Sequence, residues 1–152
     1  MPRVNFVKKA QKNNPAVNKG ESYYWWKFRY GRKHYSKTSP KRSQLTQSDF
    51  LSQMYDIEDQ LSEISGEDRE DLCSQTEEIT EEIRQLGEEQ QEKLYNMPEQ
   101  LQESSPAGET LQNRIEMCEE MVSELESIVF DDEDQAIEDL IDEIQNISYQ
   151  GE

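Results

Sequence analysis

The spacing of hydrophobic positions changes near residue 44, from the alternation of strands to the longer period of helices. Residues 22–30 are dense in the aromatic residues that favour strands, and Gly31 interrupts them before a second such segment at 32–37. This pattern predicts a β-hairpin. Alternation assigns residues of the first strand to an aromatic face and a mixed face: Tyr24, Trp26, Phe28 and Tyr30 on the first, and Tyr23, Trp25, Lys27 and Arg29 on the second.

After a polar linker, apolar residues recur every three or four positions, which is typical of amphipathic helices. Ser65 with Asp68 three residues later fits a capping box, Pro98 is expected to kink or end a helix, and residues 104–108 fit a turn or a cap. The acidic residues 131–134 suit the start of a last helix. The four stripes are Phe50, Met54, Ile57, Leu61 and Ile64; Leu72, Thr76, Ile79, Ile83, Leu86, Leu94, Met97 and Leu101; Leu111, Ile115, Cys118, Val122, Leu125 and Val129; and Ile137, Ile141, Ile144 and Ile147.

These elements predict a mainly α protein with four parts. A basic flexible arm at 1–20 precedes an aromatic β-hairpin module at 21–42, an acidic helical body at 43–148 and a tail at 149–152. The narrow stripes favour a slim antiparallel helical bundle or coiled-coil hairpins. They also leave room for a partner or a second copy of the chain, so a homo-oligomer is one expectation.

The amino-acid composition limits how large a hydrophobic core this chain can form. Only 32% of the 152 residues are hydrophobic and the net charge is −18, a balance that borders on that of disordered chains. The helical spacing persists through four successive segments, which argues for folded helices. No apolar run is long enough for a membrane helix or a signal peptide, so we expect a soluble intracellular protein.

The net charge is the sum of two opposite halves. Residues 1–45 contain 12 Lys or Arg and one acid, Glu21, whereas residues 46–152 contain 4 basic and 33 acidic residues. A basic segment attracts phosphate or carboxylate, and an acidic body repels both. We therefore expect the two halves to have different roles.

Few residues offer catalytic or metal chemistry. His34 is the only histidine, and Cys73 and Cys118 lack the spacing of a zinc site. A Cys–His nucleophilic pair would require the fold to bring His34 to one of these thiols. The sequence therefore predicts neither an enzyme nor a metal site nor a cofactor, and two reduced, packed cysteines.

The basic half combines cations with aromatic rings. Lysines neutralise phosphates and release counterions, while exposed aromatic rings stack on unpaired bases. The pattern favours nucleic-acid binding, with single strands preferred, although the aromatic rings could instead form the hairpin's own core. Lys8, Lys9, Lys12 and Lys19 lead into the candidate binding residues, which are Tyr23, Trp25, Lys27, Arg29, Arg32, Lys33, His34 and Lys37, and Lys41 and Arg42 follow.

The acidic half supports a different hypothesis. Carboxylates at adjacent helical turns can imitate the charge spacing of DNA, so this surface could act as a DNA mimic that inhibits a DNA-binding protein. It could also engage another protein partner, pair internally with the basic residues, or simply keep a slender bundle solvated. A third alternative is an assembly scaffold. The candidate partner-binding residues are Glu77, Glu78, Glu81, Glu82, Glu88 and Glu89.

Three segments resemble a family of small, largely uncharacterised proteins of tailed bacteriophages. They are YYWWKFRYG at 23–31, SQLTQS at 43–48 and NMPEQLQ at 96–102, and the resemblance spans nearly the whole chain. It implies a phage accessory protein located in the cytoplasm of an infected bacterium, and no established activity. For such a protein, the acidic DNA mimic would inhibit a host DNA-binding or defence protein, and the scaffold would be a virion or assembly scaffold. In many relatives, paired cysteines flank the hairpin and resemble a zinc ribbon. This chain departs from that pattern, with Asn13 and Asn14 before the hairpin and residues 36–38 after it.

Overall fold

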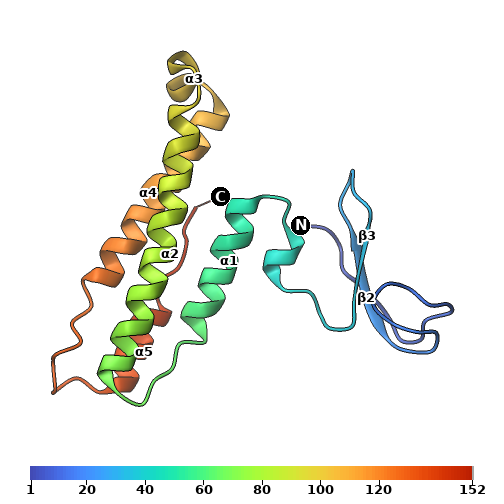
Figure 1. The fold of residues 1–152 in the computed structure, drawn as a ribbon, viewed down its shortest axis with the longest axis horizontal. Helices are drawn as coiled ribbons and strands as arrows, with labels where there is room; N and C mark the ends of the chain where they lie inside the picture. The colour runs from blue at the N-terminus through green and yellow to red at the C-terminus, as the bar shows by residue number, and fades with distance from the viewer. Residues whose placement is uncertain (152) are drawn as a thin grey trace. The chain divides into compact units, whose positions relative to one another are not determined.

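The computed structural model describes residues 1–151, which form two compact units, Met1–Ser52 and the residues from Gln53 onward. The first unit contains a small sheet and the second a set of helices (Figure 1). The mainly α fold with a small N-terminal hairpin is as predicted. The unit boundary lies later than the expected position after residue 42, because residues 42–45 form a short 3-10 helix, η1 (Arg42–Leu45), and Ser52 Oγ donates to the carbonyl of Ser43 at 3.0 Å.

The sheet has three antiparallel strands in the order β1 (Asn5–Val7), β2 (Tyr23–Lys27) and β3 (Lys33–Ser36). The predicted hairpin between β2 and β3 is confirmed, and in its turn the N–H of Gly31 donates to the carbonyl of Phe28 at 3.2 Å. Strand β1 lies within residues 1–20, where the sequence predicts a flexible arm, so that prediction is wrong for this segment. Three residues are too few to show an alternation, so pairing with β2 was not visible in the sequence.

The loop between β1 and β2 is held by its own hydrogen bonds. The N–H of Ala10 donates to the carbonyl of Glu21, and the N–H of Gly20 donates to the carbonyl of Ala10, both at 2.8 Å. Gly20 has φ of 97°, a conformation that glycine adopts without steric cost. Ala10 and Val17 are buried. The loop therefore has a defined path that the prediction of an arm did not include.

The aromatic face is shorter than alternation predicted. Trp26 is 4% exposed and stacks on His34, with 5.5 Å between ring centroids. On the same face Phe6 lies 4.9 Å from Tyr24. Because β2 ends at Lys27, the alternation does not continue to Tyr30, which is 89% exposed. The aromatic rings of this face thus pack on the sheet as far as Phe28, one residue past the end of β2, whose ring meets His34 edge-on with 5.5 Å between centroids.

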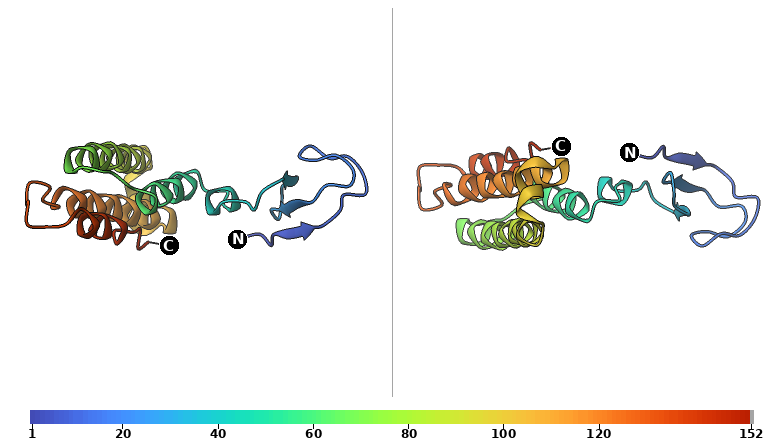
Figure 2. Two further views of the ribbon diagram at one scale, coloured as in Figure 1. Left: turned by 90° about the horizontal axis from the view of Figure 1, so that it is seen from below. Right: turned by 90° about the horizontal axis from the view of Figure 1, so that it is seen from above.

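The second unit is an antiparallel helical bundle. Its long helices α2 and α4 run side by side and are joined by the short helix α3 (Figures 1 and 2). The helices, the first of which begins in the first unit, are α1 (Asp49–Ser62), α2 (Arg69–Tyr95), α3 (Glu99–Ser104), α4 (Pro106–Glu126) and α5 (Ile137–Gln145).

Helix ends follow local capping chemistry. Asp68 itself is the N-cap of α2 and accepts from the N–H of Asp71 at 2.8 Å, so the capping box predicted to begin at Ser65 is wrong. Helix α2 ends before Pro98, as expected. Ser105 caps α4 by accepting from the N–H of Gly108 at 3.0 Å, which confirms a cap within residues 104–108.

The predicted stripes supply most of the helical core. Val129 and Leu101 depart from their stripes: Val129 is 60% exposed because α4 ends at Glu126, and Leu101 is 46% exposed in the short helix α3. The segment expected to be a tail begins with Tyr149, whose N–H donates to the Glu58 carboxylate at 2.9 Å. Among residues 1–151 no helix has the length and apolar character needed to cross a membrane. Fully buried side chains of this unit include Met54, Leu61, Leu72, Ile83, Leu125, Leu140 and Ile144.

Candidate nucleic-acid interface

A groove of about 660 Å³ lies on the mixed face of the sheet. Cross-strand pairing places Trp25 between Asn5 of β1 and Tyr35 of β3, so these strands present alternate side chains on one face. The loop between β1 and β2 contributes further residues. The groove is lined by Val7, Lys9, Gln11, Lys12, Asn14, Tyr23, Trp25, Lys33 and Tyr35.

Three aromatic rings and three ammonium groups meet in this groove. The rings of Tyr23 and Tyr35 lie 6.0 Å apart, and Lys33 Nζ lies 4.5 Å from the centroid of the Trp25 ring. The three rings are half-buried, so the fold fixes each ring and leaves part of it open to a ligand. Lys9 and Lys12 are exposed. The arrangement offers stacking surfaces beside positive charge, which suits a ligand that carries both planar rings and anionic groups.

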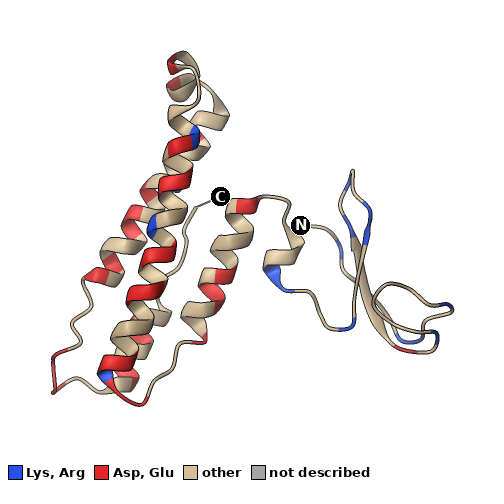
Figure 3. Ribbon diagram, viewed as in Figure 1, with Lys and Arg blue, Asp and Glu red and all other residues tan. Residues whose placement is uncertain are grey.

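Charge over the wider unit has the same sign. Lysine and arginine are distributed over the strands and loops of the first unit, whereas carboxylates cover the helices (Figure 3). Glu21 is the only acid among residues 1–45. It accepts from the N–H of Asn18 at 2.9 Å and so is part of the loop's own bonding. The groove thus lies in a unit whose electrostatic potential favours anions.

The structure gathers only part of the predicted basic site. Tyr23, Trp25 and Lys33 line the groove. His34 projects to the opposite face, where it stacks on Trp26, because successive residues of a strand alternate in direction. The other four predicted residues are exposed and do not line the groove: Lys27 at the end of β2, Arg29 and Arg32 in the turn, and Lys37 after β3.

Four groove residues were missed by sequence reasoning. Tyr35 has a signal, since it lies two residues after Lys33 in the second strand and therefore shares its face. Gln11 and Asn14 belong to the loop, whose path depends on β1 pairing with β2. Val7 belongs to β1 itself. No periodicity reveals these three positions, because a short strand and an irregular loop bring them to the sheet.

The residues at the zinc-ribbon positions do not fit a zinc site. Asn13 Oδ1 accepts from the N–H of Lys19 at 2.7 Å, and Asn14 Oδ1 accepts from two further N–H groups of the loop. After β3, the N–H of Thr38 donates to Ser36 Oγ at 3.2 Å. These are neutral oxygens engaged in turns, whereas structural zinc requires thiolates or imidazoles. Within residues 1–151 no three His, Cys, Asp or Glu side chains cluster as metal ligands.

The six predicted acidic residues are exposed on α2 but form two rows. Helical geometry separates the row of Glu77, Glu81 and Glu88 by about 100° from that of Glu78, Glu82 and Glu89. Within the bundle Glu81 pairs with Arg84 at 2.6 Å, and Glu82 accepts from Gln60 Nε2 at 2.9 Å. The carboxylates thus flank α2 on two sides and are partly engaged within the bundle.

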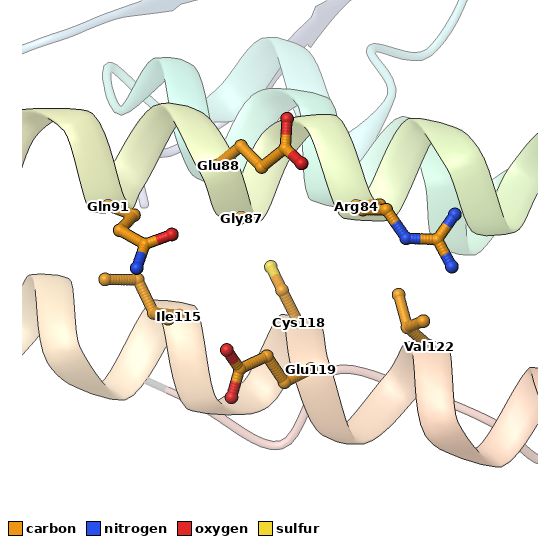
Figure 4. Close-up of a pocket in the computed structure, with 8 residues that line it drawn as sticks. All are labelled: Arg84, Gly87, Glu88, Gln91, Ile115, Cys118, Glu119 and Val122. Atoms are coloured by element: carbon orange, nitrogen blue, oxygen red, sulfur yellow. The ribbon is translucent and has the colours of Figure 1, made fainter.

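A smaller cavity of about 280 Å³ lies between α2 and α4 (Figure 4). The two helices approach closely at Gly87, where an added Cβ would lie 3.0 Å from Cys118 Cβ. Cys118 is 2% exposed, and burial together with the nearby Glu119 carboxylate raises the pKa of its thiol to about 11. A thiol with this pKa is protonated at neutral pH, so Cys118 is a poor nucleophile.

This shifted pKa predicts a loss of stability in alkali. A folded-state pKa of about 11 against an ordinary 9.0 means that the contribution of Cys118 is complete below pH 9 and is lost as pH rises through 11. We expect the free energy of unfolding of the wild type to fall by about 2 kcal/mol over this pH range, and Cys118→Ala to lack this loss. Urea unfolding of both proteins from pH 8 to 11 tests this, with Cys73→Ala as the control that keeps the loss. Parallel profiles for the wild type and Cys118→Ala would contradict it.

The sheet groove therefore offers the chemistry best suited to a ligand. Comparisons of the chain with protein families, curated proteins and solved structures give no match.

Proposed function

We propose that this protein binds single-stranded nucleic acid in the groove on the mixed face of the β1–β2–β3 sheet. The observation that carries the proposal is the meeting of Tyr23, Trp25 and Tyr35 with three lysines on one face. Aromatic rings supply stacking surfaces for successive bases, and ammonium groups neutralise the phosphates between them. No bond is made or broken in this role.

The preference for single strands follows from the rings. Bases in a duplex are stacked on one another, so their faces are not accessible to a protein ring unless the duplex opens. An unpaired strand can place a base against Trp25 while its phosphates approach Lys9 and Lys12. A duplex could use only the charges, and its binding would then be weaker and more sensitive to salt.

In this proposal Lys33 also controls the access of a base to the Trp25 ring. Its ammonium group lies over the Trp25 ring. A phosphate would draw Lys33 away from the ring, and the vacated ring face would then accept a base. The cation–π contact is worth about 1 kcal/mol at an exposed site, which a charge-assisted contact to phosphate can replace.

The acidic helices have a separate role in the proposal. With 33 acids against 4 basic residues beyond residue 45, they repel nucleic acid and favour a basic protein partner. The exposed row of Glu78, Glu82 and Glu89 would contribute to such a contact. Binding of a partner there and of nucleic acid at the sheet would let the protein connect the two.

The groove lysines provide a charge-matched test. We expect Lys9→Ala with Lys12→Ala to weaken binding of a labelled single strand about tenfold in fluorescence anisotropy, because two phosphate contacts are lost. The control is Lys19→Ala with Lys37→Ala, which removes the same charge from exposed positions outside the groove. We expect the control to lose no more than about threefold. Equal losses would show that net charge, and not the groove, determines binding.

A further inference from the structure

The side chain of Asn14 is fixed in orientation at the wall of the groove. Its Oδ1 accepts from the N–H groups of Ala16 and Val17, each at 3.0 Å. A rotated amide would direct its NH₂ group at these two donors, so the turn permits only one orientation. Asn14 lines the groove, and with Oδ1 engaged in the turn, the Nδ2 group is the polar end left for a ligand.

The other polar side chains that line the groove present no acceptor in a fixed orientation that would counteract this donor. Lys9, Lys12 and Lys33 carry ammonium groups, which only donate. Gln11 is exposed and can rotate to present either end of its amide, so it imposes no fixed preference. Tyrosine hydroxyls likewise donate or accept. The fixed polar feature beside the aromatic rings is therefore a hydrogen-bond donor.

A fixed donor distinguishes bases by their exocyclic groups. Thymine and uracil carry two exocyclic carbonyl oxygens, and guanine and cytosine carry one each, whereas adenine carries an exocyclic amino group and accepts hydrogen bonds only through its ring nitrogens. A carbonyl oxygen would accept from Asn14 Nδ2. An amino group in the same place would direct its N–H groups at the N–H groups of Asn14 Nδ2, so neither donor would have an acceptor. We propose that Asn14 makes this groove select a base with a carbonyl oxygen, thymine or uracil first, over adenine. The inference rests on the proposed binding of single strands.

The ratio of two affinities tests the role of Asn14. The full chain is titrated with labelled thymidine and deoxyadenosine oligomers of about 12 nucleotides. Asn14→Asp keeps an oxygen for the N–H groups of Ala16 and Val17 and replaces the donor by an acceptor. We expect its preference for the thymidine oligomer to fall about fivefold relative to the wild type, the value of one hydrogen bond.

Asn13→Asp is the matched control. It adds the same charge to the same loop, keeps the bond from the N–H of Lys19, and lies outside the groove lining. Both variants lose affinity for both oligomers, since each adds a negative charge. Only Asn14→Asp is expected to change the ratio of the two affinities. An unchanged ratio in Asn14→Asp, with wild-type binding intact, would overturn the inference and leave the proposed function standing.

A second comparison leaves the protein unchanged. Hypoxanthine keeps the purine ring of adenine and replaces the amino group by a carbonyl oxygen. We expect the wild type to bind a strand in which hypoxanthine replaces adenine about fivefold more tightly. Equal binding of the two strands would overturn the inference even if Asn14→Asp failed to fold. If neither oligomer bound the wild type at all, the proposed function itself would fall.

Discussion

Trp25→Ala is expected to weaken binding of a single strand about 5- to 150-fold, the equivalent of about 1 to 3 kcal/mol for one stacked base. Trp25 lies between its cross-strand neighbours Asn5 and Tyr35, so its ring is the central stacking surface of the groove. Its removal also eliminates the ring over which Lys33 Nζ lies. Fluorescence anisotropy with a labelled oligonucleotide measures the loss.

Tyr30→Ala is the control for the Trp25 variant. Tyr30 is 89% exposed, lies outside the strands and contributes nothing to the groove lining, so its removal is expected to change affinity less than twofold. Circular dichroism of both variants checks that the fold is retained. If Tyr30→Ala weakened binding as much as Trp25→Ala, exposed aromatic rings in general, and not this groove, would hold the strand.

Gln90→Leu is expected to raise the free energy of unfolding by about 1 to 3 kcal/mol. Gln90 lies in α2 with 0% of its surface exposed, and within residues 1–151 neither Oε1 nor Nε2 has a hydrogen-bond partner. A buried amide without partners costs free energy that a leucine of similar size avoids. The helix propensities of the two residues are close, so burial decides the sign. Urea denaturation measures the change.

Gln91→Leu separates burial from hydrophobicity. Gln91 is the next residue of α2 and is exposed, so the same substitution there is expected to change stability by no more than about 0.5 kcal/mol. A gain at position 91 as large as that at position 90 would show that added apolar surface, and not the removal of a buried amide, stabilises the bundle. A loss at position 90 would contradict the account of the core.

Helical periodicity predicted the second unit well because its stripes are long. Apolar residues repeated over several turns identify a buried face, and the position of Pro98 identified a helix end. Gln90 and Thr80 are exceptions within α2, since each is a polar residue at a buried position outside the predicted stripe and breaks the pattern without breaking the helix. Asp68 shows the limit at helix ends, because its carboxylate caps a helix that begins three residues later than a cap at Ser65 predicts.

The candidate site was only half predictable. Alternation assigned Tyr23 and Trp25 to one face, and composition identified the cations. The position of His34 on the opposite face follows from the register of β3, which the turn at Gly31 determines and the composition does not. Asn14 enters the groove through a loop held by its own side-chain oxygens, a feature without sequence period. The phage origin implied by the resemblance stays a prediction.

Titration of the full chain with a labelled single strand and with its duplex, in fluorescence anisotropy across a salt series, separates stacking in the groove from attraction by charge alone. Stacking in the groove predicts saturable binding of the single strand that weakens with salt but persists, and weaker binding of the duplex with a steeper dependence on salt. Equal affinity for both forms would contradict stacking in the groove. No binding of either form at low salt would contradict the proposed function.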